Sequence, residues 1–243
     1  MSFKTRATAT DVPMFRLKPP SVSVDKRYET GCTLDNVIRG FPIGLTLIYG
    51  NPGSGKSTLM KHIASKHVPE VVLYIVVESV KDAPTNLISK QRVAFYNKYR
   101  PKPEKLLSEL WKLQEYLNAK IVVLDSISGV FQWEAEIRQP IFDLAITAEE
   151  KGVALVGISQ IRGYGQPAGG YGLAHAASLV LNITKFPVDA KWLAERYRAQ
   201  EGSIVHLLTV EKDRDGIADQ GSQYIYRWSG QPGLTEPEFE RVA

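Results

Sequence analysis

Residues 45–60 read LTLIYGNPGSGKSTLM, and this stretch decides the fold of the chain. Its apolar beginning predicts a buried strand over Leu45–Tyr49. The pattern G-x-x-x-x-G-K-[ST] follows, and a helix is expected from Lys56 onward. Such a loop wraps a phosphate with its own backbone N–H groups, and its glycines leave room for that approach. The predicted phosphate-binding positions are Gly50, Asn51, Pro52, Gly53, Ser54, Gly55, Lys56, Ser57 and Thr58.

Two side chains of this loop carry specific chemistry. Lys56 is expected to reach the β- and γ-phosphates of ATP, and the Ser57 hydroxyl is expected to ligate Mg²⁺. The alternative is a glycine turn with a surface lysine, but the flanking strand and helix patterns favour the nucleotide site. ATP and Mg²⁺ are therefore the predicted cofactors.

The composition is that of an ordinary globular protein with a mild excess of positive charge. The 243 residues carry a net charge of +4, and the isoelectric point is about 9.0, which is compatible with nucleic acid as a partner. Cys32 is the single cysteine, so an internal disulfide is excluded and a reducing, cytoplasmic location is expected. No window has the roughly 18 apolar residues of a membrane span, so no membrane partner is expected.

The chain is expected to form one large domain, residues 29–243, preceded by a basic arm, residues 1–28. The arm contains three prolines and one candidate strand at residues 21–24. Two interpretations of it stay open, because it could dock on a neighbouring subunit or form a disordered tail. The polar tail after Gly230 is assigned no strand.

Apolar runs alternate with helical patterns along the rest of the chain. An apolar stripe of leucines at 106, 110, 113 and 117 predicts one helix, and residues 139–151 predict another, with Pro140 in its first turn. Strands are expected at 71–77, 121–124, 153–158 and 177–184, with a hairpin at 204–211 and 223–228. The alternation predicts an α/β fold: a mostly parallel, doubly wound sheet with helices on both faces and a C-terminal antiparallel hairpin.

Polar or flexible residues stand where the expected parallel strands end, at Gly50, Glu78, Asp125 and Gln160. Ligands of such sheets bind beyond the carboxyl ends of the strands. Asp125 is expected to hold Mg²⁺ through water, and Glu78 to take a proton from the attacking water. Gln160 is a candidate sensor of the γ-phosphate. The competing interpretations are a turn cap for Asp125, a surface carboxylate for Glu78 and a packing residue for Gln160.

Three segments combine basic and aromatic residues. Residues 90–105 fit an amphipathic helix with a solvated basic face better than a nucleic-acid surface. The glycine-rich loop 161–172 carries Arg162, Tyr164 and Tyr171, which are the predicted DNA-binding residues because aromatic rings stack on bases. The insertion 185–200 is the reserve candidate, with an adapter site for a partner protein as its rival interpretation.

The segment after the last long apolar strand alternates bases and acids, as Lys212-Asp213-Arg214-Asp215-Gly216. Alternation along an extended chain places Lys212 and Arg214 on one side. From spacing alone, a salt-bridged turn is the favoured interpretation.

With these motifs placed, the chain resembles the RecA-type ATPase superfamily. It is most similar there to archaeal RadA paralogues, KaiC-like proteins and the ATPase core of bacterial RadA/Sms and DnaB. The resemblance runs from about Thr30 to Pro237, and its specific segments are LYIVVESV with Glu78, VVLDSISGV with Asp125, PAGGYGLAHAASLVLNI and the KxRxG element. It implies a RecA-like P-loop core in which Lys212 and Arg214 reach the nucleotide of an adjacent subunit, within a ring or short helical array.

The resemblance further implies a Mg²⁺-dependent ATPase acting on single-stranded DNA in recombination or repair, with a recombinase or other protein as a possible partner. Several family features are missing, among them a helix-hairpin-helix domain, a clear FxxA tether and a zinc finger. An accessory or hexameric ATPase is therefore expected rather than a strand-exchange protein. Two alternatives stay open: a KaiC-like regulatory ATPase with a protein partner, and an ATP-binding scaffold with little turnover.

Overall fold

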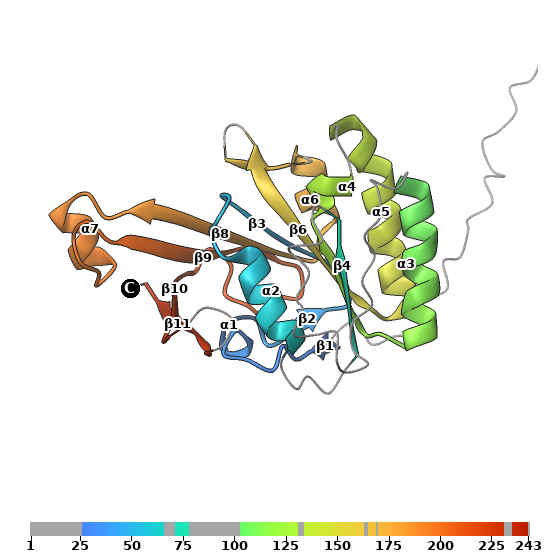
Figure 1. Ribbon diagram of the computed structural model, residues 1–243, viewed down its shortest axis with the longest axis horizontal. Coiled ribbons are helices and arrows are strands. Elements are labelled where there is room, and N and C mark those ends of the chain that lie inside the picture. The colour runs from blue at the N-terminus through green and yellow to red at the C-terminus, as the bar shows by residue number, and fades with distance from the viewer. Residues whose placement is uncertain are drawn as a thin grey trace, which may run out of the picture.

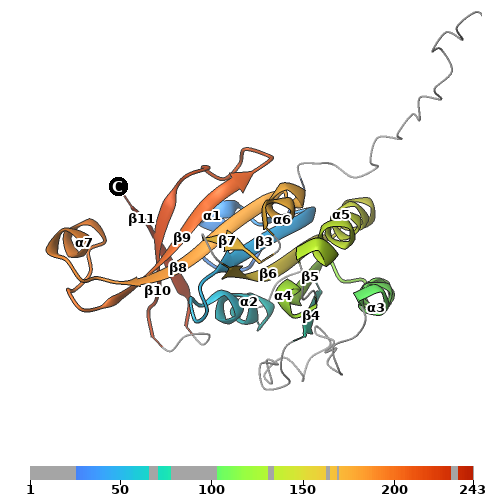
Figure 2. The ribbon, with the colours of Figure 1, turned by 90° about the horizontal axis from the view of Figure 1, so that it is seen from above.

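The computed structural model describes residues 26–65, 71–77, 103–130, 134–162, 165–168, 170–230 and 235–242 (Figures 1 and 2). Within them, one nine-stranded sheet has the order β11-β10-β9-β8-β3-β6-β5-β4, with β7 paired to β6. A separate short pair joins β1 (Arg27–Tyr28) to β2 (Phe41–Pro42). The strands of the large sheet are β3 (Gly44–Gly50), β4 (Val72–Val76), β5 (Ile121–Asp125), β6 (Ala154–Arg162), β7 (Gln166–Pro167), β8 (Leu179–Pro187), β9 (Ile204–Asp213), β10 (Gln223–Trp228) and β11 (Pro237–Arg241).

The sheet has a parallel half and an antiparallel half. Strands β8, β3, β6, β5 and β4 run parallel, and β9, β10 and β11 add antiparallel strands beyond β8. The parallel strands β3, β4 and β5 are buried from end to end, in the way that strands covered on both faces must be. The predicted mixed α/β fold is therefore confirmed.

Helices cover both faces of the parallel half, each burying its own apolar stripe. Residues alternate along β3, so that Ile48 packs with α1 and α2 while Leu47 packs with the helices of the opposite face. On the first face lie α1 (Asp35–Ile38) and α2 (Lys56–Ser65). The second face is covered by α3 (Pro103–Leu117), α4 (Ile127–Val130), α5 (Glu134–Lys151) and α6 (Gly170–Ala176).

The expected leucine-striped helix is α3, and its side chains Leu106 and Leu110 are each only 1% exposed. The helix expected from 139 begins earlier, at Glu134, so Pro140 lies inside α5 rather than in its first turn. Pro140 has no N–H to donate there, but the turns that follow it are held by buried residues such as Ile141 and Leu144. Helix α5 ends at Lys151, and Gly152 then takes a positive φ of 63°, as expected for a helix end.

Three other boundaries differ from the sequence prediction because pairing between strands extends them. β6 runs past Gln160 to Arg162, where β7 pairs with it, so the glycine-rich loop is shorter than expected. β8 continues to Pro187 because β9 pairs with it as far as Ile204. The C-terminal tail contains β11, whose Phe239 stacks on Tyr226 with ring centroids 5.2 Å apart.

The long β8–β9 hairpin reaches outward from the body and carries α7 (Lys191–Arg196) at its tip (left in Figures 1 and 2). From here on, the arm means this element, residues 183–208, and not the N-terminal residues 1–28. Val188, Tyr197, Val205 and Leu207 of the arm form a small apolar cluster with Ile225 of β10. The expected insertion 185–200 is the outer part of this arm. No helix among the described residues has the length and apolar character needed to cross a bilayer.

Candidate active site

The loop between β3 and α2 has the glycine geometry that a phosphate-binding loop needs. A Cβ on Gly50 would lie 1.7 Å from the carbonyl oxygen of Ile183, so only glycine lets β3 pass β8 at this point. Gly53 and Gly55 have φ values of 69° and 95°, which side chains rarely adopt. The α2 helix begins at Lys56, as predicted, so its first N–H groups face the loop.

The Lys56 side chain is turned back into this loop. It is 6% exposed, and its Nζ donates hydrogen bonds to the carbonyl oxygens of Gly50 (2.9 Å) and Asn51 (2.7 Å). Ser54 Oγ lies 3.4 Å from the same nitrogen. An ammonium held among backbone carbonyls at the centre of the loop is positioned to exchange them for phosphate oxygens.

Ser57 and Asp125 come from different elements and meet at the mouth of the loop. Ser57 Oγ, at the start of α2, donates to Asp125 Oδ1 over 3.2 Å. Tyr74 on β4 donates to the other carboxylate oxygen over 2.7 Å and so orients it. A hydroxyl and a carboxylate are the hard oxygen donors that Mg²⁺ prefers. Beside them, the loop glycines form a cradle, a space that a Cβ at these positions would fill. These residues fit a magnesium ion bound together with phosphates.

Gln160 lies beside the loop, as predicted, but inside β6 rather than at its end, because the strand continues to Arg162. Its register partner across β3–β6 is Gly50, and its side chain is exposed. Glu78 lies outside the described residues. The described part of its strand ends at Val77, whose N–H donates to the Asp125 carbonyl over 2.8 Å.

Lys212 and Arg214 lie at the C-terminal end of α6, away from the phosphate-binding loop of their own chain. Lys212 Nζ donates to the carbonyls of Ala174 and His175, both at 3.0 Å, and Arg214 Nη2 donates to His175 over 2.6 Å. Burial and the nearby Arg214 guanidinium lower the pKa of Lys212. Both bases contact the same carbonyl, that of His175, whereas Asp213 between them pairs with Arg27.

The predicted DNA-binding residues fall largely beyond what the structure describes. Tyr164 lies outside the described residues, and so do the side chains of Arg162 and Tyr171. Their backbones place Arg162 at the end of β6 and Tyr171 in the first turn of α6. The DNA-binding role of these residues remains a prediction.

The arm also contacts the phosphate-binding loop, and the sequence prediction missed this contact. His206 Nδ1 of the arm lies 3.0 Å from the carbonyl oxygen of Ser54. Next to it, on β10, the Tyr226 ring lies 3.1 Å from where a Cβ on Gly55 would be. A Cβ on Gly53 would lie 2.8 Å from Lys185 Nζ. Only the basic, aromatic composition of residues 185–200 hinted at a role for this region, because the contact depends on how β8 and β9 pair.

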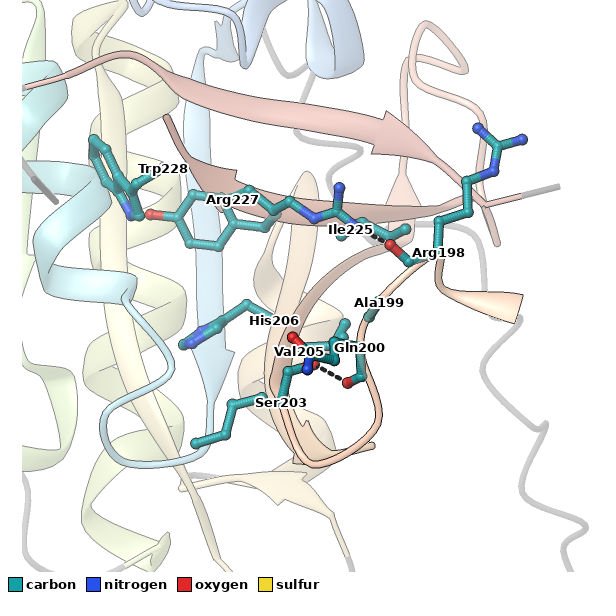
Figure 3. A pocket seen from close by; sticks show the side chains of 11 residues that line it. Arg198, Ala199, Gln200, Ser203, Val205, His206, Ile225, Arg227 and Trp228 are labelled. Atoms are coloured by element: carbon teal, nitrogen blue, oxygen red, sulfur yellow. Dashed lines mark hydrogen bonds between the residues drawn. The ribbon is translucent and has the colours of Figure 1, made fainter. Parts of the chain in front are cut away.

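A cavity of about 390 Å³ lies between the arm and β10, next to this contact (Figure 3). Its two arginines are already paired, because Arg198 and Arg227 both bind Glu240 on β11. The polar and aromatic residues of its wall include Arg198, Gln200, Ser203, His206, Tyr226 and Arg227. The cavity therefore adjoins the loop but adds no unpaired cation of its own to it.

A family model described as the ATPase KaiC matches residues 80–215, which is more than half of the chain. The chain belongs to the KaiC family of ATPases. A search of curated proteins finds no match. Among solved structures, the KaiC-like protein PH0186 from the hyperthermophilic archaeon Pyrococcus horikoshii OT3 is similar, with a TM-score of 0.67 and 17% identity. The alignment covers 88% of this chain and 98% of that one.

The KaiC family match confirms the resemblance to RecA-type P-loop ATPases, and the structural likeness confirms the fold. The family model covers Asp125, Gln160, Lys212 and Arg214, whereas the phosphate-binding loop lies N-terminal to the matched range. The family match indicates ATPase chemistry, and the phosphate-binding loop and Asp125 meet at one edge of the sheet.

Proposed function

We propose that this KaiC-family chain is a Mg²⁺-dependent ATPase whose turnover is coupled to single-stranded DNA, as an accessory ATPase of recombination or repair. The observation that carries the ATPase part is the contact between Ser57 and Asp125 beside the glycine cradle. A glycine turn that binds no ligand would not require a buried lysine, a hydroxyl and an oriented carboxylate at one point.

The residues would divide the work as follows. The backbone N–H groups of the loop and Lys56 would hold the β- and γ-phosphates. Ser57 and Asp125 would hold Mg²⁺, which neutralises charge that develops on the phosphates during transfer. Tyr74 keeps the Asp125 carboxylate facing Ser57. Glu78 would accept the proton of the attacking water, and Gln160 would contact the terminal phosphate from the neighbouring strand.

DNA is the proposed partner because Gln160 leads directly into the segment that carries Arg162, Tyr164 and Tyr171. A change at the terminal phosphate could therefore reach a base-stacking surface within a few residues. The net charge of +4 also supports a polyanionic partner. A homo-oligomer in the cytoplasm is the proposed setting, with a recombinase or another protein as a further partner.

The KaiC family match favours a second candidate, a regulatory ATPase whose partner is a protein. In that case the same ATPase site would be coupled to a protein rather than to DNA. A third possibility, an ATP-binding scaffold with little turnover, would show intact binding without hydrolysis.

The test is ATP hydrolysis measured with and without single-stranded DNA at low salt. Wild-type protein is expected to hydrolyse ATP faster with DNA. Lys56→Ala should lose tight ATP binding or turnover, whereas Lys61→Ala on the same helix should change neither. Glu78→Gln should keep ATP binding and lose turnover, because binding and proton acceptance are carried by different groups.

A double variant separates the DNA part of the proposal from the ATPase part. Tyr164→Ala with Tyr171→Ala should weaken single-strand binding, since stacking contributes about 1–3 kcal/mol per base, and should leave basal hydrolysis intact. Hydrolysis that DNA never stimulates, in a protein that does not bind DNA, would select the protein-partner candidate. ATP binding without hydrolysis would select the scaffold.

A further inference from the structure

Lys185 lies on β8 where the arm passes the phosphate-binding loop. A Cβ on Gly53 would lie 2.8 Å from Lys185 Nζ, so the ammonium stands directly over that glycine. The side chain itself is exposed. Lys185 therefore lies next to the phosphate-binding loop of its own chain, whereas Lys212 and Arg214 contact α6.

The backbone beneath Lys185 is held firmly against the loop. Lys185 pairs with His206 across the β8–β9 ladder. His206 Nδ1 in turn lies within hydrogen-bond distance, 3.0 Å, of the Ser54 carbonyl. Lys185 and His206 thus meet two successive residues of the loop, Gly53 and Ser54, and a rigid ladder sets where the ammonium can reach.

The other cations of this region have partners, and Lys185 has none in the part of the chain that the structure describes. Arg198 and Arg227 pair with Glu240, and Lys191 lies 3.9 Å from Glu195. Lys56 donates to carbonyls inside the loop. An unpaired ammonium next to the N–H groups of a phosphate-binding loop is arranged for an anion.

We propose that Lys185 is a second phosphate-binding cation of this site, supplied in cis by the arm and contacting the polyphosphate of a nucleotide held at Gly53. The inference rests on the proposed nucleotide site. It gives the arm a function in nucleotide affinity that a single subunit can exercise without a neighbour.

The test measures binding of the β,γ-imido analogue of ATP, of ADP and of adenosine by isothermal titration calorimetry at low salt, at a protein concentration where the species is verified. Lys185→Ala is expected to weaken the ATP analogue about ten-fold and ADP by less, and to leave adenosine unchanged, because only phosphates meet the ammonium. Lys185→Arg should stay within about three-fold of wild type. Lys191→Ala, an exposed lysine on the same arm, is the matched control and should bind like wild type.

Each outcome decides a separate point. Wild-type protein that binds no ATP analogue would overturn the proposed nucleotide site and this inference with it. If wild type binds and Lys185→Ala matches Lys191→Ala, the inference alone is overturned. An equal loss for adenosine would assign Lys185 to the shape of the site rather than to phosphate contact, and would overturn it as well. Because Lys185 is exposed and has no described partner, the variant is expected to fold, which circular dichroism checks.

Discussion

At the scale of single residues, Tyr49 shows how a polar group inside the sheet is held next to the phosphate-binding loop. Its hydroxyl donates to Glu211 Oε1 over 2.5 Å, and Asn182 Nδ2 donates to the same oxygen over 2.9 Å. Tyr49→Phe should lower the free energy of unfolding at pH 7 by about 1–3 kcal/mol, since a hydrogen bond to a charged acceptor is lost. Urea denaturation measures this, and Tyr224→Phe is the control, because its hydroxyl makes no hydrogen bond among the described residues.

The free energy of unfolding of Tyr49→Phe should also differ from that of wild type in its dependence on alkaline pH. Burial, together with the hydrogen bond and charge of Glu211, raises the pKa of Tyr49 above its ordinary value of 10.0. Below pH 10 the Tyr49 hydroxyl keeps its proton in both the folded and the unfolded chain, so its hydrogen bond stabilises the fold fully. Above pH 10 the unfolded chain loses the proton first, so the free energy of unfolding of wild type should fall. Tyr49→Phe should fall less steeply over this range, and parallel curves for the two proteins would contradict the assignment.

At the scale of elements, β1 is joined to the turn after β9 by a buried ion pair. Arg27 Nη2 lies 2.6 Å from Asp213 Oδ1 and 2.9 Å from Asp215 Oδ2, and the Asp213 side chain is fully buried. Arg27→Ala should therefore cost about 3–5 kcal/mol of unfolding free energy, because Asp213 is left as an uncompensated charge. Arg27→Lys should not restore it, since an ammonium cannot reach the two acids, as Nη2 does, and also the carbonyls of Ile38 and Gly40, as Nη1 does.

The control for this prediction is Arg241→Ala, which removes an exposed ion pair with Asp219. Such a pair is worth at most about 1 kcal/mol. Denaturation curves for the two alanine variants compare a buried bridge with a surface one in the same protein. Similar losses in both would show that Arg27 does not hold β1 in place.

At the scale of the whole molecule, the positions of Lys212 and Arg214 bear on assembly. Both cap α6 of their own chain, so a trans contact with a neighbour's nucleotide would require them to leave the carbonyls of Ala174 and His175. Arg214→Ala should lose ATPase by about 10³-fold or more if it acts as an arginine finger, while it still folds and binds ATP. Mixing it with Lys56→Ala subunits should restore some activity at interfaces where Arg214 meets an intact loop.

Sizing chromatography with and without nucleotide must accompany that mixing experiment, because rescue needs a verified mixed oligomer. Full activity in a strictly monomeric protein would rule out the trans arrangement. The Lys185 inference makes the two contributions separable, since Lys185 is expected to set nucleotide affinity within one chain and Arg214 to set turnover between chains.

The sequence by itself determined the parallel core and the position of the phosphate-binding loop. Both depend on local patterns, since continuous apolar runs such as Val72–Val76 and the glycine spacing from Gly50 to Gly55 carry their meaning without distant contacts. The strand end at Asp125 could be predicted for the same reason, because a parallel sheet brings such ends to one edge, whereas β6 continues past Gln160 to Arg162.

Only the tertiary structure decided what lies beside that loop and how far the elements run. The extension of β8, the strand β11 and the meeting of Lys185 and His206 with the loop all depend on the register between strands distant in sequence. The buried Arg27–Asp213 pair joins residues 186 positions apart. Such contacts follow from how strands pair and twist, and no local pattern in the chain specifies that pairing.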